Sequence, residues 1–198
     1  MKADAGTVDR IVSAAALVAE SDGLSGLTVS KVAARAEVSS ALVHYHFDTK
    51  QRLLVAAARR LAAARVDRRT ASLKGRKALS ALDALWDVVE KDAAGGAERA
   101  WLELLALAHG DRSVQEIVVS SRASERSMLA ARLPAVLLEL GAGTAPEPDE
   151  EEVASALAAL LDGLAASLTA GEPPAQVRAA YDAFWLALIA AGQNAGGR

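Results

Sequence analysis

Apolar residues recur along this chain at the three- and four-residue spacing of amphipathic helices. The first such segment covers residues 7–22, with Thr7 as its candidate N-cap. Two shorter segments follow, one that Thr28 can cap and one that Ser39 can cap. Two short helices joined by a tight corner form the helix-turn-helix unit, whose second helix enters the major groove of DNA. The pattern therefore predicts a helix-turn-helix DNA-binding domain at residues 1–50.

Helical spacing continues through the rest of the chain. Six further helices are expected, at residues 49–72, 77–92, 97–109, 112–140, 149–170 and 175–191. One face of the expected helix at residues 49–72 carries Leu53, Leu54, Ala57, Leu61, Ala64 and Arg65. We expect the helix over 112–140 to kink or break before Pro134, because proline cannot donate the helical hydrogen bond. Alanine is abundant and strand-forming residues are sparse, so the chain is expected to be all-α, with about nine helices.

Composition narrows the class of protein further. The chain has 198 residues, 52% of them hydrophobic but only 4% aromatic, so alanine and leucine would fill its core. It has no cysteine, which excludes disulfides, thiolate catalysis and cysteine-ligated zinc. We find no apolar run of membrane-spanning length and no signal peptide, so we expect a cytoplasmic protein without a membrane partner.

Charge is divided unevenly along the chain. The net charge of -3, taken alone, argues against nucleic-acid binding. Residues 27–77 nevertheless hold 12 basic and 3 acidic residues, a net +9, whereas residues 1–26 carry -2 and residues 78–198 carry -10. A basic end joined to an acidic body is the charge pattern of a DNA-binding head on a body that does not bind DNA. A solvated charged helix over residues 50–77 would account for part of the excess.

One stretch of the chain resembles a known protein family. Its characteristic residues are Gly23, Leu27-Thr28-Val29, Val32-Ala33, Ala36, Val38-Ser39, Val43-His44-Tyr45-His46-Phe47, Lys50 and Leu53. In these residues the chain resembles the TetR/AcrR family of bacterial transcriptional regulators. Near the C-terminus, Leu161-Asp162-Gly163-Leu164-Ala165 is similar to the penultimate-helix motif of the subgroup that includes choline-pathway repressors.

The resemblance implies that residues 39–45 form the helix that enters the major groove. The residues that it assigns to DNA binding are Thr28, Ser39, Ser40, Leu42, His44, Tyr45, His46 and Lys50. Their chemistry agrees, since a lysine at a helix start can pair with phosphate and a leucine can touch a thymine methyl group. Phe47 is expected to fill the core. The chain departs from the family at Ala41 and His44, and at Glu37, where a left-handed corner would cost glutamate on the order of 1 kcal/mol relative to the usual glycine.

For residues 51–198 the resemblance implies a ligand-binding and dimerisation domain. The candidate pocket residues are Trp86, Trp101, Leu105, His109, Val118, Arg122 and Met128. The candidate dimer-interface residues are Leu157, Leu161, Leu164, Leu168, Tyr181, Trp185 and Leu188. A two-fold dimer would set two recognition helices about 34 Å apart, one turn of DNA. The alternative, that these apolar residues simply fill the core of their own chain, stays open.

Nothing in the sequence favours an enzyme. The chain has no Gly-x-Ser-x-Gly motif, no paired-acid spacing and no glycine-rich phosphate loop. His44 and His46 lack the further ligands of a metal site, so neither a metal nor a cofactor is expected. The predicted function is a ligand-responsive transcriptional regulator, most simply a repressor, that binds a palindromic operator in double-stranded DNA as a homodimer and is released by a small-molecule effector. The alternative is a non-enzymatic helical binding or scaffold protein with non-specific affinity for nucleic acid.

Overall fold

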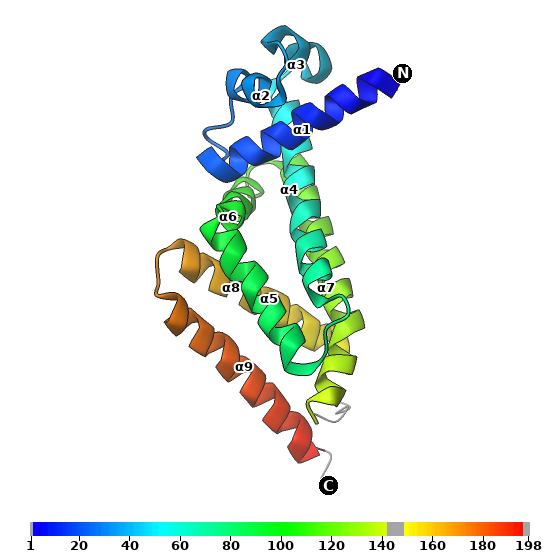
Figure 1. Cartoon of the computed structure of the whole chain (residues 1–198), viewed down its shortest axis with the longest axis vertical. Helices are drawn as coiled ribbons and strands as arrows, with labels where there is room; N and C mark the ends of the chain where they lie inside the picture. Colours follow the sequence, from blue (N-terminus) through cyan, green and yellow to red (C-terminus); the bar gives the residue numbers. More distant parts are fainter. Residues whose placement is uncertain (1, 142–148, 196–198) are drawn as a thin grey trace. The chain divides into compact units, whose positions relative to one another are not determined.

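Helices are the only regular elements in the part of the chain that the computed structural model describes, residues 2–141 and 149–195 (Figure 1). They are α1 (Lys2–Asp22), α2 (Val29–Ala36), α3 (Ser40–Phe47), α4 (Lys50–Leu73), α5 (Ala78–Ala94), α6 (Ala97–Leu107), α7 (Arg112–Glu139), α8 (Glu150–Thr169) and α9 (Pro174–Ala195). Nine helices and no strand within these residues confirm the all-α fold expected from the sequence.

Two helices differ from what the sequence pattern predicts. α1 begins at Lys2, so Thr7 lies inside the helix rather than at its N-cap, since the alanines before it favour an earlier start. α7 runs through Pro134, so of the kink or break expected there, the break is excluded. The turns on both sides of this proline are held by the buried side chains of Leu133 and Val136, and that packing outweighs the one hydrogen bond that proline removes.

The chain divides into two compact units, and α4 and α7 each contribute residues to both. The first unit comprises Met1–Arg65 and Gly95–Ser120, and the second comprises Val66–Ala94 and Ser121–Arg198. Each unit has its own apolar core. The assignment of DNA binding to residues 1–50, and of ligand binding and dimerisation to residues 51–198, concerns function rather than packing and stays a prediction.

The core of the first unit gathers the apolar faces of the N-terminal helices. α1 packs against α2, and α2 packs against α3. The side chains that lose nearly all contact with solvent there include Ile11, Leu27, Val32 and Val43. Burying each of them contributes roughly 1.5–3 kcal/mol. Phe47 belongs to the same core with 9% of its surface exposed, as the sequence predicts.

The corner between α2 and α3 has a glutamate in the left-handed position. Glu37 has φ 55° and ψ 46°, a backbone conformation that glycine adopts without strain and other residues do not. Its amide donates to the carbonyl of Ala34 at 3.3 Å, and the amide of Val38 donates to the carbonyl of Ala33 at 3.0 Å. This is the Schellman arrangement, which closes a helix and sets the direction of the following chain. The corner thereby fixes how the backbone enters α3.

In the second unit, α5 packs against both α8 and α9. The hydroxyl of Tyr181 in α9 donates to the carbonyl of Leu82 in α5 at 2.8 Å, and burial raises the pKa of this phenol. Arg178, one turn earlier in α9, pairs with Asp83 of α5 at 2.5 Å. Its guanidinium carbon lies 5.5 Å from the ring centre of Trp86. A buried hydrogen bond, an ion pair and a cation–π contact therefore hold α9 to α5.

Five residues assigned to a dimer interface lie in the core of their own chain. They are Leu157, Leu161, Leu164, Tyr181 and Trp185, each at most 6% exposed. Little of these side chains is left for a second chain to cover, which favours the alternative that they fill their own core, and their place in a dimer interface stays a prediction. Leu168 and Leu188 are half-buried and keep some surface for a partner.

α8 is long and apolar enough, by length and composition alone, to cross a membrane, so the expectation that no segment has this property is wrong. It is the one helix of that kind in the described residues. Its apolar face is buried within the second unit, where Leu157, Leu161 and Ala165 have no exposed surface, as in the core helix of a globular domain. A capping box formed by Asp149 and Glu152 starts the helix.

We predict that Glu37→Gly stabilises the first unit by roughly 0.5–1 kcal/mol, because glycine adopts the left-handed corner without a Cβ clash. Urea unfolding of the full chain measures the change. Ala34→Gly, at an exposed position inside α2, is the matched control and should destabilise the same unit by about 1 kcal/mol. A loss of stability in Glu37→Gly would mean that the glutamate side chain makes an interaction stronger than the strain.

Candidate nucleic-acid interface

α3 turns one face to the core and the opposite face to solvent. Its start is fixed by Ser39, whose hydroxyl accepts a hydrogen bond from the amide of Leu42 at 3.1 Å. Val43 and Phe47, one turn apart, anchor the inner face in the first core. On the outer face, Tyr45 is 75% exposed. A short, anchored helix with polar side chains outward is the element that a helix-turn-helix protein inserts into the major groove.

The eight predicted DNA-binding residues lie on α3, at the N-caps of α2 and α3, and at the start of α4. Those exposed to solvent are Thr28, Ser39, Ser40, His44, Tyr45 and Lys50. Leu42 and His46 are half-buried, and the His46 ring lies edge-on to the Tyr45 ring with 5.1 Å between their centres. The contact of each residue with DNA stays a prediction.

Two of these residues already have a structural role. The hydroxyl of Thr28 accepts from the amide of Lys31 at 3.3 Å, as that of Ser39 does at the start of α3. A hydroxyl that accepts through one lone pair keeps its own O–H to donate to a phosphate or a base. Capping and DNA contact are therefore compatible. No group of three or more histidine, cysteine, aspartate or glutamate side chains that could hold a metal ion occurs among the described residues.

Several cations of the first unit form ion pairs at its surface. Lys31 pairs with Asp22 at 2.6 Å and lowers the pKa of that carboxyl group, and Arg60 pairs with Asp9. Exposed pairs of this kind contribute little to stability, so a phosphate group can replace the carboxylate. Some exposed cations form neither an ion pair nor a hydrogen bond through their side chains among the described residues: Arg10, Arg35, Lys50 and Arg59.

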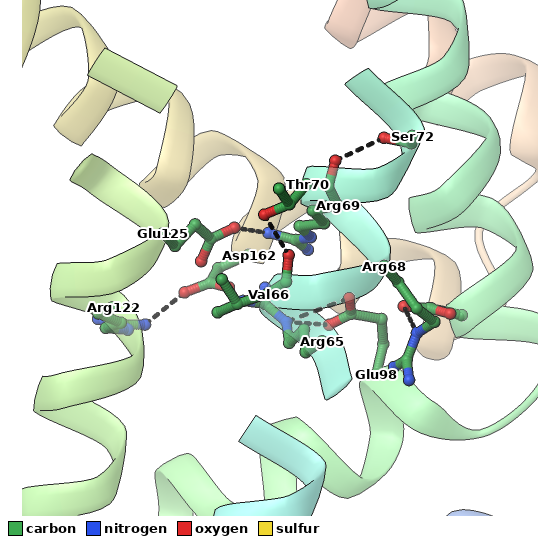
Figure 2. Close-up of polar contacts among 11 residues, drawn as sticks. Arg65, Val66, Arg68, Arg69, Thr70, Ser72, Glu98, Arg122, Glu125 and Asp162 are labelled. Atoms are coloured by element: carbon green, nitrogen blue, oxygen red, sulfur yellow. Dashed lines mark hydrogen bonds and ion pairs between the residues drawn. The ribbon is translucent and has the colours of Figure 1, made fainter. Parts of the chain in front are cut away.

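The C-terminal half of α4 uses its arginines inside the protein (Figure 2). In the first unit, Arg65 is 2% exposed, and its Nε donates to both carboxylate oxygens of Glu98 at 3.3 Å. The guanidinium carbon also lies 4.6 Å from the ring centre of Trp101. This arginine, which the sequence places on the apolar stripe of its helix, is therefore a core residue with a buried counter-ion.

Two further arginines are paired within the second unit. Arg69 pairs with Glu125 in Figure 2, and neither side chain is more than 1% exposed. Arg68 pairs with Asp92 at 2.8 Å. The count of +9 for residues 27–77 therefore overstates the charge that this segment offers to DNA. The position of Arg65 on the stripe was the one sequence signal for this, and no local pattern marks Arg68 or Arg69.

The seven predicted pocket residues fall in both units. Trp101, Leu105, His109 and Val118 belong to the first unit, and Trp86, Arg122 and Met128 belong to the second. Both tryptophans are buried in the cores, and Arg122 pairs with Asp162 at 2.5 Å. The second unit contains a cavity of about 220 Å³, and none of the seven lines it. Their role in ligand binding stays a prediction.

Comparison with known proteins agrees with this geometry. Residues 11–57 match the model of the bacterial regulatory proteins of the tetR family, and residues 76–190 match the model of the BetI-type transcriptional repressor C-terminal region. The HTH-type transcriptional regulator BetI of Rhizobium meliloti (strain 1021) is 31% identical over 158 residues, which cover 78% of this chain and 73% of that protein. The chain belongs to the TetR family.

Solved structures share the fold of this TetR-family protein. A putative TetR-family transcriptional regulator from Rhodococcus sp. has a TM-score of 0.73 at 24% identity, covering 92% of this chain and 98% of its own. A putative transcriptional regulator from Saccharomonospora viridis, in complex with choline, has a TM-score of 0.69 at 22% identity, covering 89% of this chain and 93% of its own. TetR-family proteins are DNA-binding transcriptional regulators, which confirms the predicted class of function.

Ser39 caps α3 and is predicted to contact DNA, and a pair of substitutions should separate these two roles. Ser39→Asp keeps an N-cap acceptor and should leave the free energy of unfolding within about 0.5 kcal/mol of the original, while its carboxylate should weaken DNA binding by repelling phosphate. Ser39→Ala removes the cap and should cost roughly 1 kcal/mol. Chemical unfolding and titration with duplex DNA measure the two effects. Equal destabilisation in both variants would contradict the cap, and unchanged binding in Ser39→Asp would contradict a place beside the DNA.

Proposed function

We propose that this TetR-family regulator binds a palindromic DNA operator as a homodimer, represses transcription in the bacterial cytoplasm, and is released by a small-molecule effector. The observation that carries the proposal is the outward face of α3. This helix is capped by Ser39, anchored by Val43 and Phe47, and exposes His44 and Tyr45. Repression is the simplest outcome, because occupying an operator blocks other proteins without any further surface.

We assign each predicted DNA-binding side chain either to base edges or to the phosphate backbone according to its chemistry. Ser39, Ser40, Leu42 and His44 are assigned to base edges or nearby phosphates, with Leu42 suited to a thymine methyl group. Thr28, Tyr45, His46 and Lys50 are assigned to the phosphate backbone. Lys50 supports this assignment, since it is exposed, lies in the first turn of α4 and has no ion-pair partner among the described residues.

A homodimer supplies the second reading helix that a palindrome needs. Each chain has one α3, and the two half-sites lie about 34 Å apart on DNA. Because five of the leucine and aromatic residues that the sequence suggests for an interface are buried in the core of their own chain, we propose that the interface lies on the outward faces of α8 and α9. Leu186 of α9 is 69% exposed there, and a Cβ added to Gly163 of α8 would meet nothing within 4 Å beyond its chain neighbours and the backbone of its own helix.

The effector would act by binding one conformation of the dimer more tightly than another, which shifts the population away from the form that fits the operator. Support for a small molecule comes from the family and from the Saccharomonospora viridis relative, whose structure contains choline. The residues proposed for this role include Arg122, whose pairing with Asp162 places a charged group between α7 and α8. An enzyme has no support in a family of transcriptional regulators.

Selection of bound duplexes from a random-sequence pool should recover a palindromic operator. On that operator, Lys50→Gln should reduce the slope of log affinity against log salt concentration by about 1, since one phosphate contact is lost. Lys91→Gln, an exposed lysine in α5, is the control and should leave the slope unchanged. Binding that is indifferent to sequence and to Lys50→Gln would favour the alternative of a helical scaffold with non-specific nucleic-acid affinity.

Leu186→Glu should convert the dimer to monomer and weaken operator binding at least tenfold, because it places a carboxylate in the proposed apolar interface. Sedimentation equilibrium of the full chain measures the association. Leu79→Glu in α5 is the matched control, since Leu79 is 63% exposed and lies outside α8 and α9. A variant Leu186→Glu that stays fully dimeric would remove this face from the interface.

A further inference from the structure

The cavity of about 220 Å³ in the second unit is enclosed mostly by apolar side chains from α5, α7, α8 and α9. Its buried wall includes Leu82, Leu85, Leu129, Leu133, Leu157 and Trp185, each at most 5% exposed. A cavity of about 150 Å³ with similar walls is large enough for benzene. This cavity therefore has room for one ring or a short chain together with a small polar group.

The rim of the cavity is cationic. The charged residues that the described part of the chain places in the lining are Arg76, Lys77, Arg132 and Glu139, with a net charge of +2. The carboxylate of Glu139 is already engaged, because it accepts from the amide of Ala78 at 2.8 Å and lies 3.9 Å from Nζ of Lys77. Arg76 and Arg132 are both exposed, and no carboxylate in the described part of the chain forms an ion pair with either.

We propose that this cavity binds a small amphipathic carboxylate. Its apolar body lies against the leucines and Trp185, and its carboxylate lies at the rim between Arg76 and Arg132. A guanidinium presents two parallel N–H groups that match the two oxygens of a carboxylate. Apolar walls with a few placed polar groups are the general form of small-molecule sites. Arg76 comes from the turn before α5 and Arg132 from α7, so the ligand would join the two elements.

The same charges disfavour a cation of equal size. A quaternary ammonium ion is held by carboxylates or by several aromatic faces. Here Glu139 is engaged by the start of α5, Trp185 is the one aromatic residue among the described residues of the lining, and two arginines would repel the ligand. The expected ligand is thus opposite in charge to the choline found in the Saccharomonospora viridis relative. That such a carboxylate is also the effector rests on the proposed function, whereas its binding to the cavity does not.

Three probes with the same phenylpropyl body separate these possibilities: 3-phenylpropanoate, 3-phenylpropan-1-ol and 3-phenylpropylammonium. Isothermal titration of the full chain, without DNA, should give a dissociation constant in the micromolar to millimolar range for the carboxylate. The alcohol should bind at least about 5-fold more weakly, because it cannot form charge-assisted hydrogen bonds with the arginines. The ammonium ion should bind more weakly still, because the arginines repel its positive charge.

Substitutions locate the binding site. Arg76→Gln and Arg132→Gln should each weaken the carboxylate about 3- to 10-fold and leave the alcohol unchanged. Ala135→Trp should abolish binding of all three probes, because Ala135 is an exposed residue of the cavity lining and its replacement blocks the opening without disturbing the core. Arg126→Gln, an exposed arginine of α7 outside this lining, is the charge control and should have no effect.

The proposal is overturned if the ammonium ion binds as tightly as the carboxylate, if no probe binds, or if Ala135→Trp binds like the original chain. It is equally overturned if Arg76→Gln and Arg132→Gln leave carboxylate affinity unchanged. Because all these measurements are made without DNA, failure to release an operator would count against the effector role alone and not against the site.

Discussion

The pairing of arginines with carboxylates along α4 is the constraint that both cores have to satisfy. An arginine buried without its counter-ion costs several kcal/mol, so Glu98 and Glu125 have to face Arg65 and Arg69 before the surrounding apolar side chains can close. Arg65 and Arg69 are one turn apart and share a face of the helix, which fixes the rotation of α4 about its own axis. Such pairs add little net stability compared with apolar packing, but any other register would leave buried charges uncompensated.

The sequence predicts interactions between residues that are close together in the chain. It does not predict interactions between residues that are far apart in the chain. Thr28 and Ser39 cap their helices through residues three positions away, so local spacing predicts both. Arg69 and Glu125 are 56 residues apart, and no local pattern joins them. The apolar stripe through Leu161 predicts that a neighbour will cover it but not which one, and the neighbour is its own chain. The sequence does not predict the cavity either, because the lining comes from several helices that are far apart in the chain.

The basic residues in the segment 50–77 therefore have several different roles. At the start of this segment, Lys50 stays exposed in the first turn of α4, the helix that follows α3. In the middle of this segment, Arg65 and Arg69 form ion pairs with buried carboxylates. At its end, Arg76 lies at the rim of an apolar cavity. A charge count over the whole stretch adds these residues together, whereas affinity for DNA depends only on those that can reach a phosphate.

The glutamate at the corner before α3 bears on how a regulator searches a genome. Glu37 is exposed next to α3, the helix that we propose enters the groove, and a carboxylate there would be repelled by the backbone of every duplex, whatever its sequence. Such repulsion shortens each unproductive encounter, and the contacts made by α3 on the right sequence can offset it. Since the non-specific sites in a genome greatly outnumber operators, weaker binding to all of them leaves more free protein for the few correct ones.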